Sequence, residues 1–390
     1  MAQQVPAHID PADEAYWSGI RDQYVLNDEV INLENGFFGV PSKPVQQALE
    51  EYNRLVNREG SFFMRTRYPQ RLAAVVKALA DFTGASEEEL LIVRNPTEGM
   101  NILIQGYPFR PDDEVVIGNQ DYDSVDETLQ MMQQRGRLKL VRIALPFHPK
   151  NDEEIVALYE NAITPKTRVL LVTHILHRTG QILPVAKIAD MAQRRGIDVF
   201  VDAAHSFAHL DYRLPQLGCS FIAAHLHKWL GAPMGVGLLY IRKERVRDIA
   251  PLFGDTTHAD SDIRKLGHFG TTPPAPELAI EDAIAFHNMI GGSNKEARLR
   301  YLKDYWTSRV KRLPGIELMV PDDPQRSCAI AAFRVNGKDA QDVAEYLFQA
   351  HRIFTVAPIV NGERVVRVTP HLYNTPADLD KLVAALEALK

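Results

Sequence analysis

Between residues 89 and 243, short runs rich in valine, isoleucine and leucine alternate with amphipathic stretches of helical length. Near-continuous apolar runs of this length are typical of strands that are covered on both faces, as in a mostly parallel α/β sheet. Such a sheet binds ligands beyond the carboxyl ends of its strands, so polar residues that directly follow a run are the first candidates for a site. We expect strands at residues 89–94, 114–118, 138–145, 168–173, 197–202, 221–224 and 237–241, with helices between them, as at 123–135 and 185–195.

A chain of 390 residues is long enough for one large and one small domain. The last third of the sequence has the pattern of a smaller α+β unit, and the proline-rich TTPPAP predicts a boundary near residue 270. We therefore expect an N-terminal arm (1–30) that packs on the small domain, a large domain (31–270) and a small C-terminal domain (271–390). The expected elements of the last part are helices at 277–289 and 298–312, a strand at 329–335, a helix at 340–351, the strand-like VVRVTP and a helix from Pro376.

Composition excludes several classes of partner. A formal net charge of −6 gives no basic field for nucleic acid or an anionic membrane surface. No apolar run approaches the roughly 20 residues that span a bilayer, and the first residues lack the pattern of an export signal, so a cytoplasmic location is expected. Cys219 and Cys328 give neither a metal-ligand spacing nor a disulfide framework, and no metal is expected.

The segment NPTEGMN (95–101) follows the first expected strand and opens a helical pattern. Asn95 has the position of an N-cap, Pro96 that of the first helical residue, and Glu98 falls three residues after the cap. A helix that begins directly after a strand offers free N–H groups and a positive dipole end, which suit a phosphate. An ordinary capped helix fits the same pattern.

Two ionisable residues stand at the ends of neighbouring expected strands. Asp202 ends an apolar run, where an unpaired carboxylate is costly. A protonated pyridine nitrogen is one candidate partner, and the alternatives are a protein arginine or a role as cap of the next helix. Lys228 follows the next run, in HLHKW, where a desolvated amine becomes a nucleophile for Schiff-base formation. The glycine-rich stretch 231–237 does not fit GxGxxG, which disfavours a dinucleotide-binding dehydrogenase.

Seven segments taken in order resemble the class V aminotransferase family of fold-type I pyridoxal-phosphate enzymes, and its isopenicillin N epimerase-like branch in particular. The resemblance spans nearly the whole chain and implies a mostly parallel seven-stranded sheet between helices, with a small C-terminal α+β domain. The segments are INLENGFFG (31–39), NPTEGMN, THILHRTGQILPV (173–185), VDAAHS (201–206), HLHKW, FGTTPP (269–274) and RVTPHLYNT (367–375).

The resemblance also implies roles for single residues. Lys228 would form the internal aldimine with pyridoxal phosphate and move protons at the substrate Cα, while Asp202 would keep the pyridine nitrogen protonated. His205 would lie near the ring hydroxyl. The other cofactor contacts would come from Thr97, Glu98, His225 and His227 at the phosphate, and from Tyr122 stacked on the ring. Buried core histidines and a surface tyrosine are the alternatives for these positions.

Two further positions bear on partners and substrate. Thr271 and Thr272 match a segment that reaches the phosphate of a neighbouring subunit, so the resemblance implies a homodimer with shared active sites. Arg367 matches the arginine that holds the substrate α-carboxylate through two parallel hydrogen bonds. His177 and Arg178 replace smaller or uncharged residues of several relatives, and we expect His177 to contact the substrate.

The expected function is a pyridoxal-phosphate reaction on an amino acid through an external aldimine, of the aminotransferase or epimerase kind. A carbon–sulfur lyase that works by β-elimination is the alternative enzyme. The alternative outside the enzymes is a binding module with the same fold and no catalytic activity. A desulfurase is disfavoured because residues 351–364 contain no cysteine. Arg65 and Arg67 form a cationic cluster that either reads an acidic substrate or faces water.

Overall fold

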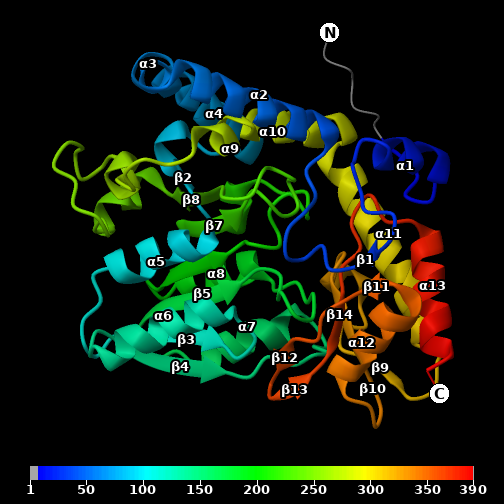
Figure 1. Ribbon diagram of the computed structural model, residues 1–390. Coiled ribbons are helices and arrows are strands. Elements are labelled where there is room, and N and C mark those ends of the chain that lie inside the picture. The colour runs from blue at the N-terminus through cyan, green and yellow to red at the C-terminus, as the bar shows by residue number, and fades with distance from the viewer. Residues whose placement is uncertain (1–7, 390) are drawn as a thin grey trace.

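A seven-stranded sheet forms the centre of the larger part of the molecule in the computed structural model, which describes residues 8–389 (Figure 1). The strand order is β2-β8-β7-β6-β5-β3-β4, and β8 alone runs antiparallel to its neighbours. The predicted mostly parallel sheet of seven strands is therefore confirmed. The strands are β2 Leu90–Val93, β3 Glu114–Gly118, β4 Lys139–Ile143, β5 Thr167–Thr173, β6 Asp198–Asp202, β7 Phe221–His225 and β8 Gly237–Ile241.

Both faces of the sheet are covered, which explains its unbroken apolar strands. Alternate residues of a strand point to opposite faces, so Val169 and Leu171 join one core cluster while Leu170 and Val172 join the other. Helices α5 and α6 cover the first face, and α4, α7, α8 and α10 cover the second. The helices of this part are α2 Lys43–Glu59, α3 Ser61–Thr66, α4 Tyr68–Thr83, α5 Pro96–Gly106, α6 Asp123–Gln134, α7 Asp152–Asn161, α8 Val185–Gln193, α9 Pro274–Leu278 and α10 Ile280–Ile290.

A smaller unit is built around an antiparallel sheet with the order β14-β10-β9. Its helices pack on the sheet around Trp306, Phe333 and Leu347. This unit lies beside the carboxyl ends of the large sheet's parallel strands (Figure 1). Its elements are α11 Gly292–Val310, β9 Ile316–Leu318, β10 Ala331–Val335, α12 Ala340–His351, β11 Ile353–Phe354, β12 Ile359–Val360, β13 Glu363–Arg364, β14 Val366–Val368 and α13 Pro376–Glu387.

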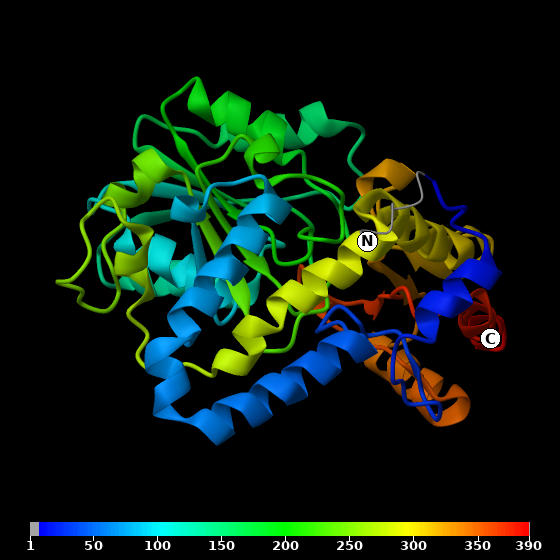
Figure 2. The same ribbon diagram turned by 90° about the horizontal axis from the view of Figure 1, so that it is seen from above.

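Two helices connect the parts. Seen from above, α10 and α11 run one after the other from the helical layer to the smaller unit (Figure 2). Helix α10 packs on α2 and α4, and α11 packs on α13. The division of the chain into an arm, a large domain and a small domain stays a prediction. Short 3₁₀ helices lie at Glu87–Glu89, Leu214–Leu217, Lys243–Asp248, Ile263–Gly267 and Pro324–Arg326.

The N-terminal segment lies against the smaller unit. Helix α1 (Glu14–Arg21) begins after Asp13, whose carboxylate accepts hydrogen bonds from the first turn. Arg298 of α11 donates to the carbonyl of Pro11 over 2.8 Å and forms an ion pair with Glu14. Further along, strand β1 (Ile31–Asn32) pairs in parallel with β11. Across residues 8–389, no helix is both long enough and apolar enough to cross a membrane.

Candidate active site

A small pocket lies where the parallel strands β5, β6 and β7 end. Because these strands run in the same direction, the residues that follow each of them meet at one edge of the sheet. The N-termini of α5 and α6 close the pocket from the side. Its lining residues are Pro96, Thr97, Tyr122, Thr173, His177, Asp202, Ala204, His205, His225 and Lys228.

The amine of Lys228 faces this pocket, and its charge is disfavoured there. The pKa of Lys228 is lowered to about 7, because burial and the charge of Arg367 lower it by more than the charges of Asp202 and Glu34 raise it. Close to neutral pH a large fraction of the amine is therefore uncharged. An uncharged lysine amine can attack a carbonyl carbon, which an ammonium group cannot.

Asp202 is a buried carboxylate without a cationic partner of its own. Its side chain is 3% exposed, and its Oδ1 accepts a hydrogen bond from the Ala204 N–H over 2.8 Å. Burial raises the pKa of Asp202, while the Ala204 N–H and the Lys228 charge lower it. Within residues 8–389 no arginine or lysine forms an ion pair with it, so the alternative of a partner arginine is not met among the described residues. A cationic ring nitrogen would complete the site.

His205 connects the pocket lysine to a buried tryptophan. The His205 Nε2 lies 3.0 Å from the Lys228 Nζ, and the Trp229 indole N–H donates to the His205 Nδ1 over 3.4 Å. An indole N–H can only donate, so the neutral ring carries its proton on Nε2, towards the lysine. Burial and the charges of Lys228 and Arg367 lower the pKa of His205 well below its usual value, which keeps the ring neutral. Sequence reasoning missed Trp229.

The start of α5 has the predicted Asn95 cap but not the return contact from Glu98 to the N–H of Asn95 that would complete a capping box. The Asn95 side chain accepts from the Glu98 N–H over 3.0 Å, and the Thr97 hydroxyl lies 3.2 Å from that of Ser124 at the pocket wall. Glu98, in contrast, is turned away, because its carboxylate accepts from the Arg94 N–H over 2.8 Å and from the Arg94 guanidinium. Both polar groups of Glu98 are used within the helix start, so the expected phosphate contact from this residue is not supported.

Two histidines lie at the carboxyl end of β7, His225 as its last residue and His227 just after it, and only His225 faces the pocket. The His225 ring lines the pocket, and its buried Nδ1 has no hydrogen-bond partner among the described residues. The His227 ring packs 4.1 Å from it and is 3.2 Å from the Val236 carbonyl through Nδ1. Burial lowers the pKa of His227 to about 4. His225 is thus the histidine that is placed to meet a phosphate.

Tyr122 and His177 form the outer wall. Their rings are perpendicular, with centroids 5.2 Å apart, and the Tyr122 ring is 41% exposed. Burial and the charges of Arg178, Arg367 and Lys228 lower the pKa of His177 well below its usual value. The guanidinium of Arg178 forms an ion pair with Asp123, so its charge is already compensated.

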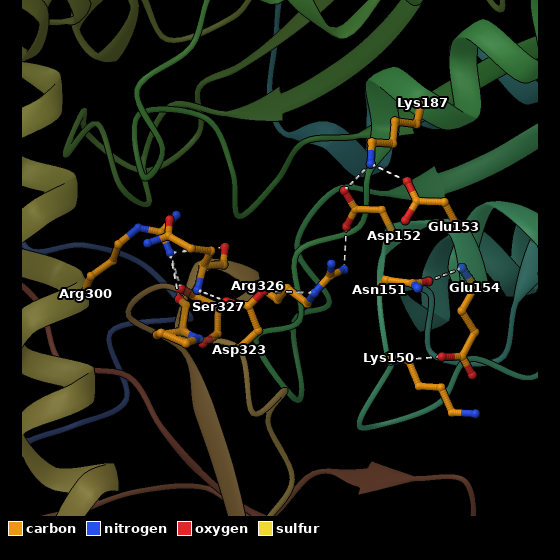
Figure 3. A network of polar contacts seen from close by, with 12 residues as sticks. Lys150, Asn151, Asp152, Glu153, Glu154, Lys187, Arg300, Asp323, Arg326 and Ser327 are labelled. Atoms are coloured by element: carbon orange, nitrogen blue, oxygen red, sulfur yellow. Dashed lines mark hydrogen bonds and ion pairs between the residues drawn. The ribbon is translucent and has the colours of Figure 1, made fainter.

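His177 lies in a hairpin in which Ile175 and Ile182 form an antiparallel bridge, and this hairpin is hydrogen-bonded to the smaller unit. The Ile182 N–H donates to the Arg326 carbonyl over 2.8 Å, and Gln181 forms an isolated antiparallel bridge with Ser327. The Arg326 guanidinium contacts Asp152 at the start of α7, and the same carboxylate lies 2.9 Å from the Lys187 Nζ (Figure 3). The wall of the pocket therefore depends on contacts across both parts of the molecule.

Arg367 lies in β14 and is 8% exposed, but it does not line the pocket. Its Nη1 donates to the His177 carbonyl over 2.7 Å, and its Nε and Nη2 contact the Glu34 carboxylate. The predicted carboxylate-binding arginine thus already has a carboxylate partner. The sequence signal for Glu34 was a single acidic residue within INLENGFFG.

The other predicted site residues lie away from the pocket. Thr271 is exposed, and the Thr272 hydroxyl donates to Glu277 over 3.0 Å. Neither threonine faces the pocket of its own chain, which leaves their role across a subunit boundary a prediction. Arg65 is exposed, and Arg67 forms an ion pair with Glu59 over 2.9 Å. Neither arginine reaches the pocket, so the cluster is a water-facing one in the single chain.

These features fit pyridoxal phosphate. The pocket joins a lysine amine with a lowered pKa to a buried carboxylate that needs a cation. Its other end combines the N-terminus of α5 with Thr97 and the unpaired Nδ1 of His225, which suit a phosphate. An aldehyde, a pyridine nitrogen and a phosphate on one small ring match these three groups.

Two curated proteins are similar to this chain over nearly its whole length. Isopenicillin N epimerase of Streptomyces clavuligerus is 28% identical, over 96% of this chain and 98% of that protein. A probable cysteine desulfurase of Methanothermobacter thermautotrophicus is also 28% identical, over 95% of this chain and 96% of that protein.

Solved structures share the fold. The apo cysteine desulfurase of Thermococcus onnurineus NA1 has a TM-score of 0.84 at 22% identity, over 95% of this chain and 97% of that one. A C-DES variant with glycine covalently linked to its pyridoxal-phosphate cofactor has a TM-score of 0.85 at 20% identity, over 94% of this chain and 98% of that one. Residues 42–382 match the family described as aminotransferase class V. The predicted family is thereby confirmed, and the chain belongs to the class V aminotransferase family.

Proposed function

We propose that the chain is a pyridoxal-phosphate-dependent enzyme that acts on an amino acid, with an aminotransferase or epimerase-like reaction. The observation that carries the proposal is one pocket holding both Lys228, with its pKa lowered to about 7, and the buried carboxylate of Asp202. When bound there, pyridoxal phosphate would withdraw electrons from the bonds to the Cα of the amino acid. The protein would supply orientation, charge and proton transfer.

Each pocket residue has a defined task in this proposal. Lys228 would hold the cofactor through Nζ and would move the proton at the substrate Cα. Asp202 would keep a proton on the pyridine nitrogen, because a buried carboxylate favours a cation beside it. His205 would hold a proton on Nε2 next to the lysine, and Trp229 would fix that tautomer.

The remaining residues would position the cofactor and the substrate. The N-terminus of α5, with Thr97 and His225, would hold the phosphate, and Thr271 and Thr272 of a second chain would complete that contact. Tyr122 is the aromatic side chain that we expect against the cofactor ring. His177 and Arg367 are the residues that we expect on the substrate side.

A carbon–sulfur lyase is the second candidate, and similarity to a probable cysteine desulfurase favours it. The desulfurase reaction itself needs a reactive thiolate. Cys219 and Cys328 are both buried, and burial raises the pKa of each thiol to about 12. Neither cysteine lines the pocket. A lyase activity would therefore have to release the sulfur without a protein thiolate as acceptor.

The first test locates the cofactor. The protein loaded with pyridoxal phosphate is reduced with borohydride, digested and mapped by mass spectrometry, and we expect the pyridoxyl group on Lys228. Lys295 is the built-in control, because burial lowers its pKa to about 7 as well, yet its Nζ donates to the Trp229 carbonyl outside the pocket. A pyridoxyl group on Lys295, or on no lysine, would contradict the proposal.

A second assay separates the reactions. Each amino acid of an L and D panel is incubated with the loaded protein, with and without a 2-oxo acid. Inversion of the Cα centre indicates an epimerase, and a new 2-oxo acid that exceeds one equivalent per site only with the acceptor indicates an aminotransferase. A 2-oxo acid together with ammonia and sulfide, without an acceptor, indicates the lyase. A loaded protein that changes none of the panel would instead be the idle binding module.

A further inference from the structure

The guanidinium of Arg367 is paired with a buried carboxylate of its own chain. Its Nε lies 3.3 Å from the Glu34 Oε2, its Nη2 contacts the Glu34 Oε1, and its Nη1 donates to the His177 carbonyl over 2.7 Å. Both partners of the ion pair are 8% exposed. Two parallel donors facing two carboxylate oxygens is the arrangement that a bound α-carboxylate would need.

The backbone holds Glu34 in this position. The Glu34 N–H donates to the Asn32 side chain over 2.9 Å, and Glu34 forms a parallel bridge with Thr369, two residues after Arg367. On either side of it, Leu33 accepts from the Thr369 N–H over 2.7 Å, and Asn35 is fully buried. The carboxylate is therefore presented to Arg367 by a fixed segment and does not reach it from a flexible loop.

The neighbouring Gly36 leaves room for this contact. A Cβ on Gly36 would lie 3.3 Å from the Thr369 Cγ2 and 3.4 Å from the Arg367 Cζ. The backbone of the segment thus passes directly against the guanidinium. Three of the five N–H groups of Arg367 are already used, and the charge that would attract a carboxylate is balanced by Glu34.

We propose that Glu34 competes with the α-carboxylate of the substrate for Arg367 and thereby sets the affinity of the enzyme for amino acids. An incoming amino acid must take the guanidinium from Glu34, so part of its binding free energy is spent on that exchange. The proposal rests on the proposed function, because it needs an amino acid in this pocket. It differs from a purely structural role of Glu34, in which the carboxylate only keeps Arg367 in place for the substrate.

The test is a titration of the cofactor-loaded protein, followed by the change in cofactor absorbance. The ligands are the amino acid of the panel that acts at the lowest concentration and the matching amine that lacks the carboxyl group. We expect Glu34→Gln to bind the amino acid about tenfold or more tightly and the amine as wild type does, because only the amino acid uses Arg367. The double variant Glu34→Gln/Arg367→Lys should lose this gain.

Glu14→Gln is the matched control. Glu14 also pairs with a buried arginine, Arg298, but on α1, away from the pocket, so this variant should titrate as wild type does. Glu34→Asp, whose carboxylate reaches less far, should give a smaller gain and decides the question if Glu34→Gln does not retain the cofactor. An affinity for the amino acid that is unchanged or weaker in the Glu34 variants would overturn the proposal.

The two proposals fail in different ways. If wild-type protein carries no pyridoxyl group on Lys228 after reduction, the proposed function fails. If Lys228 is labelled and the amino acid still binds the Glu34 variants no more tightly than wild type, only the competition at Arg367 fails. Equal gains for the amino acid and the amine would also overturn it, since the amine has no group for the guanidinium.

Discussion

Two buried lysines of this protein have a similarly lowered pKa but lie in different surroundings. Burial brings the pKa of both Lys228 and Lys295 to about 7. Lys228 opens onto a pocket with a buried carboxylate and an unpaired histidine nitrogen, whereas the Lys295 amine donates to a backbone carbonyl inside the fold. A perturbed pKa alone therefore does not locate a site, and the surrounding groups decide between a catalytic and a structural amine.

The lowered pKa of Lys228 predicts how cofactor attachment depends on pH. Only the uncharged amine reacts, and a pKa of about 7 means that this form dominates above neutral pH. We expect the rate at which protein stripped of its cofactor takes up pyridoxal phosphate to rise with pH and to be half-maximal near pH 7, as followed by cofactor absorbance. Lys295→Met should leave this midpoint unchanged. A midpoint near the ordinary lysine value would show that the amine is not desolvated.

Part of the site could be predicted from the sequence, because it needs only the positions at which strands end. Thr97, Asp202 and Lys228 each stand at or just after the end of a strand, and strands that run in the same direction bring such residues to one edge of the sheet. Glu34 and Trp229 could not be predicted in this way. Glu34 meets Arg367 across 333 positions of sequence, and such a contact is decided by how two parts of the chain pack.

At the scale of the elements, the strands of the sheet were predicted and the outer helices were not. Strand β8 agrees with its predicted range, and β2 and β7 differ from theirs by one or two residues, because strands buried on both faces need unbroken apolar runs. The helices α2, α3 and α4 went without a prediction. In α2, Val45, Leu49 and Tyr52 recur at helical spacing although only Val45 is fully buried, so this helix was missed despite an apolar face that the sequence shows.

Helix α11 departs from prediction for a related reason. It begins at Gly292, six positions before the expected start, and its first turns bury Asn294 and Lys295. A polar segment such as this one has the sequence pattern of a loop, and only the folded structure shows that its side chains are buried. Likewise, the expected helix at 277–289 is divided between α9 and α10.

The ion pairs between α7, α8 and the Asp323–Ser327 turn give a prediction at this scale (Figure 3). The side chain of Arg326 is 14% exposed and that of Asp152 31%, while Lys187, on the same carboxylate, is 52% exposed. In double-mutant cycles followed by urea unfolding, we expect a coupling free energy of about 1 kcal/mol for Arg326→Met with Asp152→Asn, and less for Lys187→Met with Asp152→Asn. Equal coupling of both pairs would mean that burial at the Arg326 contact adds nothing.

At the scale of the whole molecule, several large apolar side chains are exposed to solvent. Phe37 is 71% exposed in the segment that contacts Lys228 through Gly39, and Met234 is 60% exposed in the turn after Lys228. Phe253 is 50% exposed in the segment that leads to Thr271. Single exposed apolar side chains are common on protein surfaces and do not by themselves mark an interface, so the homodimer stays a prediction.

A dimer with shared sites makes a sharp prediction for mixed subunits. Chains with Lys228→Ala cannot attach the cofactor but still carry both threonines, whereas chains with Thr271→Val and Thr272→Val keep the lysine and lose the threonine hydroxyls. Each variant alone should be weakly active or inactive. After the two are unfolded and refolded together, half of the dimers should be hybrids in which one of two sites is complete, which recovers roughly a quarter of wild-type activity. Sedimentation would verify the dimer in each preparation, and no recovery in a mixture that does form dimers would place Thr271 and Thr272 outside the partner's site.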